Sequence, residues 1–157
     1  MRDMDPTQVS GTAQSHRQRY FDGSERTVLA TAEEIPFPEG RLIVSRTDPA
    51  GTITQVNDSF CEISGYSREE LLGQPHCILR HPDMPAAAFR DLWSTVLAGK
   101  TWHGYVKNLC KDGRFYWVYA TVIPNLRNGK VVGFTSVRRE ASRTKIREAE
   151  ELYRTMG

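Results

Sequence analysis

The chain has 157 residues, and its 21 basic and 19 acidic side chains leave a formal net charge of +2. This length suits one domain with flanking segments. So small a charge, spread along the chain, does not favour nucleic acid or an anionic membrane as a partner. The three cysteines have no framework spacing and no apolar leader follows Met1, so we expect a cytoplasmic protein with reduced thiols.

The first forty residues differ in texture from the rest. Residues 1–15 are polar and predict a disordered leader, whereas residues 16–32 have moderate helical character that Gly23 interrupts. The prolines within residues 35–40 end any helix, because each biases the preceding residue away from the α region. We therefore interpret residues 1–40 as a leader or cap with a linker.

A globular pattern begins at residue 41. Two short apolar runs, at 42–44 and 53–56, predict a pair of strands that form a hairpin. Asn57 or Asp58 can cap the helical turn that follows, and residues 67–70 (Ser-Arg-Glu-Glu) have the spacing of a capping box. We expect short helices in this part of the chain.

The clearest helix is predicted for residues 85–98. Asp83 is a suitable N-cap, Pro85 suits the first turn, and Gly99 ends the helix. Apolar side chains recur at helical spacing, which indicates one buried face: Phe89, Leu92, Trp93, Val96 and Leu97.

Three further strands complete the domain, at residues 102–110, 115–124 and 130–138. Lys-Asp-Gly-Arg at 111–114 and Asn-Gly at 128–129 are typical hairpin turns between them. The middle strand is apolar on both alternating faces, as in a strand that is covered on both sides. The order of elements predicts an α+β fold, with a five-stranded antiparallel sheet and the helices on one face.

Residues 139–157 predict an exit helix that follows the domain at 41–138. One helical stripe carries its apolar side chains: Ile146, Ala149, Leu152, Tyr153 and Met156. We expect this helix to continue beyond Gly157, and its stripe is compatible with a homodimer. No apolar run approaches the ~20 residues that span a bilayer.

Two stretches resemble the sequence pattern of PAS domains. Residues 57–73, Asn-Asp-Ser-Phe-Cys-Glu-Ile-Ser-Gly-Tyr-Ser-Arg-Glu-Glu-Leu-Leu-Gly, resemble the family's N-x-x-F…GY…EEL-x-G stretch. Residues 111–117, Lys-Asp-Gly-Arg-Phe-Tyr-Trp, resemble its KDG…W hairpin. The resemblance extends over residues 41–138 and implies the PAS fold.

A narrower resemblance lies inside the first. Three stretches resemble the sensor domain of bacterial aerotaxis (energy-taxis) receptors. They are Gly-Gln-Pro-His at 73–76, Leu-Arg-His-Pro-Asp-Met-Pro at 79–85 and Trp-x-Gly-x-Val-Lys-Asn at 102–108. That family binds FAD non-covalently, and the resemblance implies FAD here. It assigns binding or supporting roles to Asn57, Arg80, His81, Asp83, Phe89, Trp93, Trp102, Asn108 and Tyr116.

The chemistry of these side chains suits a flavin. A flavin needs a flat apolar slot with donors for its carbonyl oxygens and acceptors for its ring N–H. The amide of Asn108 offers both, and Asn57 could act from the other side of the slot. Trp93 could stack on the ring, while Arg80 and His81 offer charge to the pyrophosphate.

Structural roles are the alternative for each of these residues. Arg80 could pair with Asp83 at the entry of the long helix, and Asn108 could be a surface residue. The aromatic side chains could simply pack in the core, namely Trp93, Trp102 and Tyr116.

Other chemistries have less support. His76, Cys77 and His81 lack a second ligand pair for a metal site. Light-sensing PAS domains have a reactive cysteine where this chain has His76, and Cys77 arrives one residue later, turned by about 100° on a helix. No Gly-rich phosphate loop or nucleophile elbow is present, so we expect a signal input and not an enzyme.

The resemblance therefore implies a redox or oxygen sensor for aerotaxis that binds FAD between the long helix and the sheet. It would signal through its C-terminal helix to an output domain beyond Gly157. Two rivals remain: a haem-binding gas sensor with His81 or His76 as axial ligand, and a cofactor-free module that serves dimerisation. The flavin hypothesis requires that this interior is an open slot, not one filled by the chain's own side chains.

Overall fold

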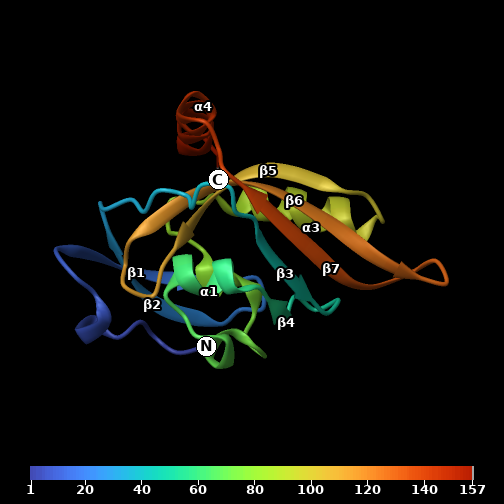
Figure 1. Cartoon of the computed structure of the whole chain (residues 1–157), viewed down its shortest axis with the longest axis horizontal. Helices are drawn as coiled ribbons and strands as arrows, with labels where there is room; N and C mark the ends of the chain where they lie inside the picture. The colour runs from blue at the N-terminus through green and yellow to red at the C-terminus, as the bar shows by residue number, and fades with distance from the viewer. Residues whose placement is uncertain (157) are drawn as a thin grey trace.

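The computed structural model describes residues 1–156, and its centre is a five-stranded antiparallel sheet in the order β4-β3-β7-β6-β5 (Figure 1). This confirms the predicted α+β fold. The strands are β3 (Ile43–Thr47), β4 (Ile53–Val56), β5 (Trp102–Leu109), β6 (Phe115–Arg127) and β7 (Lys130–Arg139).

Both predicted hairpin turns are formed. Gly113, between β5 and β6, has φ 88°, a left-handed conformation that favours glycine. Asn128 and Gly129, between β6 and β7, both have positive φ, as a type I′ turn requires. These turns set the register that aligns side chains across the sheet.

Short helices and one longer helix cover one face of the sheet, which we call the inner face. They are α1 (Asp58–Ser64), α2 (Arg68–Leu71), the 3₁₀ helix η2 (His76–Leu79) and α3 (Ala86–Leu97). Asn57 caps α1, and Ser67 and Glu70 form the predicted capping box. Asp83 does not cap α3: Pro85 occupies the N-cap position, without a side-chain hydrogen bond.

The N-terminal segment folds as a hairpin, which corrects two predictions. Residues 1–15 contain a 3₁₀ turn, η1 (Pro6–Gln8), and the start of β1 (Ala13–Arg19), so they are not a disordered leader. The helical character expected over residues 16–32 is wrong, because β1 pairs with β2 (Glu25–Thr31) in one antiparallel register.

Local chemistry explains the hairpin. Asp22 accepts hydrogen bonds from the backbone N–H and hydroxyl of Ser24, and Gly23 has φ 85°, so the tip forms a tight turn. Side chains of β2 alternate between buried and half-buried positions, and Val28 packs with Met4 and Leu109. The hairpin therefore has a small apolar cluster of its own against the end of β5.

The exit helix is confirmed as α4 (Arg143–Arg154), and Figure 1 shows it on the other side of the sheet from α1. Ser142 caps it, and Ile146 and Ala149 pack on Trp117 of β6. Strand β6 is thus covered on both faces, as its sequence predicts. Within residues 1–156, no helix is long and apolar enough to cross a membrane.

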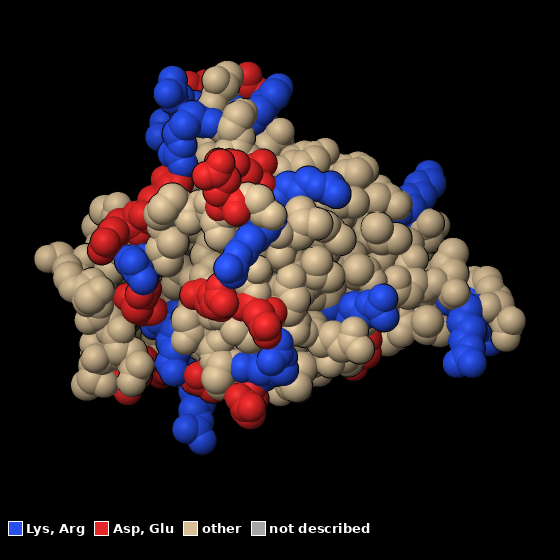
Figure 2. All heavy atoms as spheres, in the orientation of Figure 1, with Lys and Arg blue, Asp and Glu red and all other residues tan. Residues whose placement is uncertain are grey.

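Charged side chains are distributed over the surface. Figure 2 shows basic and acidic groups interspersed on the face in view, with neither sign forming a continuous field. This agrees with the formal net charge of +2.

Candidate functional site

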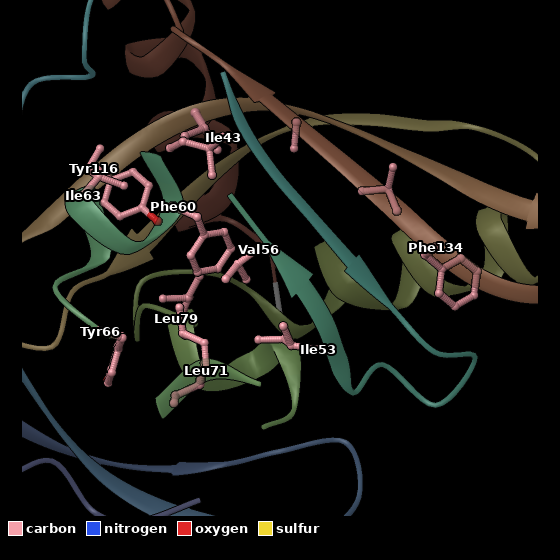
Figure 3. Close-up of a cluster of buried hydrophobic side chains, with 14 of the residues drawn as sticks. Ile43, Ile53, Val56, Phe60, Ile63, Tyr66, Leu71, Leu79, Tyr116 and Phe134 are labelled. Carbon is pink, nitrogen blue, oxygen red and sulfur yellow. The ribbon is translucent and has the colours of Figure 1, made fainter. Parts of the chain in front are cut away.

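The inner face of the sheet and the helices enclose the main core, which we call the interior compartment. Tyr116, Val118 and Ala120 alternate along β6 and face into it, where they meet Phe60 of α1 and Leu71 of α2. Figure 3 shows this cluster, with the hydroxyl of Tyr116 directed into it on the side of Phe60. Polar groups that enter the cluster are therefore shielded from water.

Several buried polar atoms have no hydrogen-bond partner among the described residues. They are Thr47 Oγ1, Arg80 Nε, His81 Nε2, Asn108 Nδ2, Tyr116 Oη and Arg138 Nη1. An unsatisfied buried donor or acceptor costs about 1–3 kcal/mol, so such atoms are rare unless something else binds them. Four of the six belong to residues that the sequence assigned to a cofactor, and this concentration points to a ligand.

Asn108 and Tyr116 lie directly opposite each other in the β5–β6 register, on the inner face. Their exposed fractions are 4% and 0%, so Asn108 is not the surface residue of the alternative interpretation. Burial raises the pKa of Tyr116 far above its usual range and keeps the hydroxyl protonated, while the side chain of Asn108 lies close enough to the hydroxyl to oppose this shift. The geometry of the contact does not meet the criteria of a hydrogen bond, so both groups can turn to another partner. The pair therefore offers an amide and a phenol to a ligand inside the compartment.

Arg80 and Phe89 meet at the edge of this pair. The Arg80 backbone forms a bridge with Asn108, and its guanidinium lies 4.9 Å from the centre of the Phe89 ring. Arg80 Nη2 donates to the Met84 carbonyl at 3.3 Å, while Nε has no partner. The alternative pairing of Arg80 with Asp83 is not formed, because Asp83 binds Lys107 Nζ at 2.7 Å.

His81 and Asp83 lie away from the compartment. Nδ1 of His81 accepts from the Asp83 backbone N–H at 3.0 Å, and its ring stands edge-on to Phe115. Because side chains alternate along a strand, Lys107 and Phe115 face away from Asn108 and Tyr116. The structure thus separates His81 and Asp83 from the inner-face pair.

Burial, and then the charge of Lys107, lower the pKa of His81 to about 4, so its ring is neutral. Partial burial opposes ionisation of Asp83, but the hydrogen bond and charge of Lys107 outweigh it and lower the pKa of Asp83. The result is an ion pair beside a neutral imidazole.

Asn57 is also outside the compartment. Its Oδ1 accepts from the backbone N–H groups of Val44 and Phe60, each at 3.1 Å, and its Nδ2 donates to Leu42 at 2.9 Å. The amide is fully engaged with the backbone. Asn57 therefore ties α1 to β3.

The two tryptophans lie at the opposite end of the compartment. Trp102 precedes Asn108 by six residues on β5, about 20 Å along a strand, and its Nε1 donates to Asp91 of α3 at 2.8 Å. Trp93 stands edge-on to Phe134, with 5.4 Å between ring centres. Both indoles join α3 to the sheet, and Trp93 is only half-buried.

Sequence reasoning missed Arg138, which enters the compartment from β7. Its exposed fraction is 2%, and its Nη2 donates to Ser45 Oγ at 3.0 Å and lies 2.5 Å from His76 Nε2. The guanidinium lies 5.0 Å from the centre of the Phe60 ring, and Nη1 has no partner. The signal was available, because Arg138 alternates with Phe134 and Ser136 on the inner face.

The interior is not the open slot that the sequence predicts. Phe60 and Tyr116 have exposed fractions of 0%, so protein side chains fill that end. Under α3 the core reaches the solvent, because Leu92, Trp93 and Val106 are half-buried. The open slot that the flavin hypothesis requires is therefore absent in this conformation, and a tricyclic ring could enter only if the helical layer moved outward.

Two clefts of the structure lie beside α4. One of about 500 Å³ is lined by Phe37, Trp117 and Ile146, and one of about 550 Å³ by Tyr105, Tyr119 and Tyr153, among others. Within residues 1–156, no three His, Cys, Asp or Glu side chains come together as a metal site.

Comparison with known proteins defines the class. A sequence model of the PAS fold matches residues 53–138, and the chain belongs to this family. It is 44% identical to the aerotaxis receptor of Escherichia coli over 127 residues, which are 81% of this chain and 25% of the receptor. It is 30% identical to the nitrogen fixation regulatory protein of Klebsiella pneumoniae over 66% of this chain and 21% of that protein.

The chain therefore spans about a quarter or less of the length of these relatives. Among solved structures, the PAS domain of a Colwellia psychrerythraea protein matches with TM-score 0.54 and 27% identity, over 64% of this chain and 86% of that one. The dark structure of the Aureochrome1 LOV photoreceptor matches with TM-score 0.62 and 21% identity, over 71% and 86%. The resemblance to PAS domains of the aerotaxis type is confirmed.

Proposed function

We propose that the chain is the sensor part of a signalling protein and that it holds FAD in the interior compartment as a redox-responsive group. The observation that carries the proposal is the set of unpartnered polar atoms on the inner face, at Asn108, Tyr116 and Arg138. The 44% identity to an aerotaxis receptor supports the same function. When bound, the flavin supplies reversible electron transfer.

Different residues of the compartment bind different parts of the cofactor. Asn108 would hold the ring through its amide, which can both donate and accept a hydrogen bond, and Tyr116 would donate its hydroxyl. Arg80, held against Phe89 at the edge of the compartment, offers charge to the pyrophosphate. Trp93 and Trp102 join α3 to the sheet, so they set how far this helix can open.

The haem alternative has a specific structural difficulty. His76 Nε2 is engaged with Arg138, and His81 belongs to the ion-pair cluster outside the compartment. Among the described residues, neither His76 nor His81 is therefore available to bind an iron inside the compartment.

The signal leaves through β7 and α4. Arg138 precedes Ser142, the N-cap of α4, by four residues, and Tyr153 of α4 donates its hydroxyl to the Tyr105 carbonyl at 2.6 Å. A change in the compartment that moves β7 would alter this docking of α4. A coupling of about 1–3 kcal/mol shifts a two-state output five- to 150-fold.

The test is the absorbance of the purified protein, followed by chromatography of the group that heat releases. We expect a two-banded visible spectrum that bleaches on reduction, and FAD as the released group. A Soret band would identify haem instead. A colourless protein that cannot be reconstituted with FAD would contradict the proposal.

A further inference from the structure

We infer that the cleft of about 550 Å³ beside α4 is a binding site for a small quaternary ammonium compound. We call it the aromatic cleft, because the rings of Tyr105, Tyr119 and Tyr153 line it together with the carboxylate of Asp91. It lies at the edge strand β5, where α3 and α4 both contact the sheet. The inference goes beyond the proposed flavin function and does not depend on it.

The first argument is the arrangement of the three rings. Tyr105 of β5 and Tyr119 of β6 lie opposite each other in the register, on the face of the sheet away from Asn108 and Tyr116. Their ring centres are 4.9 Å apart, and the planes are tilted by 49°. Tyr153 of α4 adds the third ring, which the hydrogen bond from its hydroxyl to the Tyr105 carbonyl holds in place at 2.6 Å.

These rings are suited to an organic cation. The face of an aromatic ring carries negative potential, and several rings around one space are the usual site for a quaternary ammonium group. Such a group has no N–H, so it needs ring faces and not hydrogen-bond acceptors. The volume of the aromatic cleft also lies within the range of about 300–1,000 Å³ that is typical of sites for small molecules.

The second argument is charge. Two carboxylates line the aromatic cleft, and Lys145 pairs with that of Glu148 at 3.3 Å. Asp91 forms no ion pair within the described part of the chain. Its Oδ2 accepts from Trp102 Nε1 at 2.8 Å, which orients the carboxylate without neutralising it. The aromatic cleft therefore has one negative charge that the protein leaves uncompensated.

This charge lies close to the rings. Burial, and then the charge of Asp91, raise the pKa of Tyr153, so the carboxylate acts on the ring that α4 contributes. A neutral ligand gains nothing from Asp91, and an anion is repelled by it. The combination of three rings and one free carboxylate thus favours a cation.

The position of the aromatic cleft has a consequence for signalling. A cation that contacts Tyr105 and Tyr119 on the sheet and Tyr153 on α4 would hold this helix in its docked position. Because a ligand shifts an equilibrium toward the state that it binds better, the compound would act on the same helix as the cofactor does. The sensor would then have a second input.

The experiment titrates the purified protein with choline and with 3,3-dimethyl-1-butanol, which has the same shape but a carbon atom in place of the charged nitrogen. Binding is followed by the NMR signals of the tyrosine rings. The proteins are the wild type, Asp91→Asn, Tyr119→Leu and Glu151→Gln. Glu151 is the matched control, because it is an exposed carboxylate of α4 that does not line the aromatic cleft.

We expect the wild type to bind choline at least tenfold more tightly than the neutral alcohol. Asp91→Asn and Tyr119→Leu should each lose at least fivefold in affinity for choline, whereas Glu151→Gln should stay within twofold of the wild type. Equal losses in Asp91→Asn and Glu151→Gln would show attraction by surface charge in general and would overturn the inference.

The wild type alone decides the case in which a variant does not fold. Equal affinities for choline and the alcohol, or no shift of the tyrosine signals with choline, would overturn the site. Neither result bears on the flavin proposal, which is tested by absorbance, and a colourless protein that binds choline would leave this inference standing.

Discussion

Asn57 and Asn108 show how one residue type takes different roles in this chain. Asn57 uses its whole amide to cap α1 and to tie it to β3. Asn108 is buried with a free Nδ2. The first amide therefore contributes to stability and the second is available to a ligand.

Asn57→Ala should lower the free energy of unfolding by about 1–2 kcal/mol, because an N-cap is lost together with two further backbone contacts. Asn108→Leu should leave the stability of the cofactor-free protein unchanged or raise it, because a poorly satisfied buried amide is replaced by an apolar group of similar size. Urea unfolding of both variants checks this. A destabilised Asn108→Leu and an unaffected Asn57→Ala would reverse the assignment.

The buried His81 and the half-buried His76 predict a pH dependence of stability. Burial lowers the pKa of His76 to about 3 and that of His81 to about 4, against about 6.5 in the unfolded chain. The unfolded state then binds more protons than the folded state between pH 6.5 and about 4. The stability that the neutral rings provide is complete above pH 6.5 and is lost as the pH falls through this window.

We expect the free energy of unfolding to fall below pH 6.5 by up to about 1.4 kcal/mol per pH unit for each of the two histidines. His81→Gln should remove one of the two contributions, whereas His103→Gln should not change the slope, because His103 is exposed. Denaturant unfolding at several pH values between 7 and 5 measures how steeply the free energy of unfolding changes with pH. Equal slopes in the wild type and His81→Gln would contradict the assignment.

At the scale of elements, the N-terminal hairpin depends on Arg26, whose exposed fraction is 3%. Its Nε donates to the Arg2 carbonyl at 2.7 Å, its Nη1 to the Ile78 carbonyl at 2.9 Å and its Nη2 to Tyr66 Oη at 3.2 Å. Gln18 of β1 adds a hydrogen bond to the Arg80 carbonyl at 3.1 Å. The hairpin is thus fastened to the segment that carries Arg80.

Arg26→Met should detach the hairpin, because each hydrogen bond from a charged group contributes about 1.5–3 kcal/mol. Amide hydrogen exchange should then accelerate in β1 and β2 while β6 and β7 stay protected. Arg19→Met, at an exposed position of β1, serves as the control and should exchange like the wild type. Unchanged protection in Arg26→Met would show that the anchor lies elsewhere.

The elements differ in how far the sequence could predict them. The five strands, the caps at Asn57 and Ser67 and the exit helix follow local rules of periodicity and hydrogen bonding, and they were predicted correctly. Strand β1 could not be predicted, because it has almost no apolar side chains and forms by pairing with β2. Phe21, which lies within the stretch 16–32 where helical character was expected, is 90% exposed at the hairpin tip.

The same distinction applies to the candidate site. The positions of Asn108 on β5 and Tyr116 on β6 were predictable, since both strands could be inferred from the sequence. His81 and Asp83 were assigned to the cofactor by resemblance, and in the structure they form a cluster with Lys107. Arg138 could have been found from its alternation with Phe134 and Ser136 along the predicted strand, but a charged side chain near a strand end is usually assigned to the surface.

At the scale of the whole molecule, the compartment is closed and has polar groups in need of partners. FAD binding then requires α3 to move away from the sheet, at the side where Leu92, Trp93 and Val106 are half-buried. Binding should therefore approach a limiting rate as the FAD concentration rises, because opening precedes entry. Stopped-flow flavin fluorescence measures this, and a rate that stays proportional to FAD concentration would contradict a closed compartment.

The most direct test of a cofactor on the inner face is a titration of cofactor-free protein with FAD, in the wild type and in Asn108→Leu. We predict one FAD per chain in the wild type and at least tenfold weaker binding in Asn108→Leu, because a buried hydrogen-bonding group is lost. Equal affinities in the two proteins, or no binding by the wild type, would contradict the account.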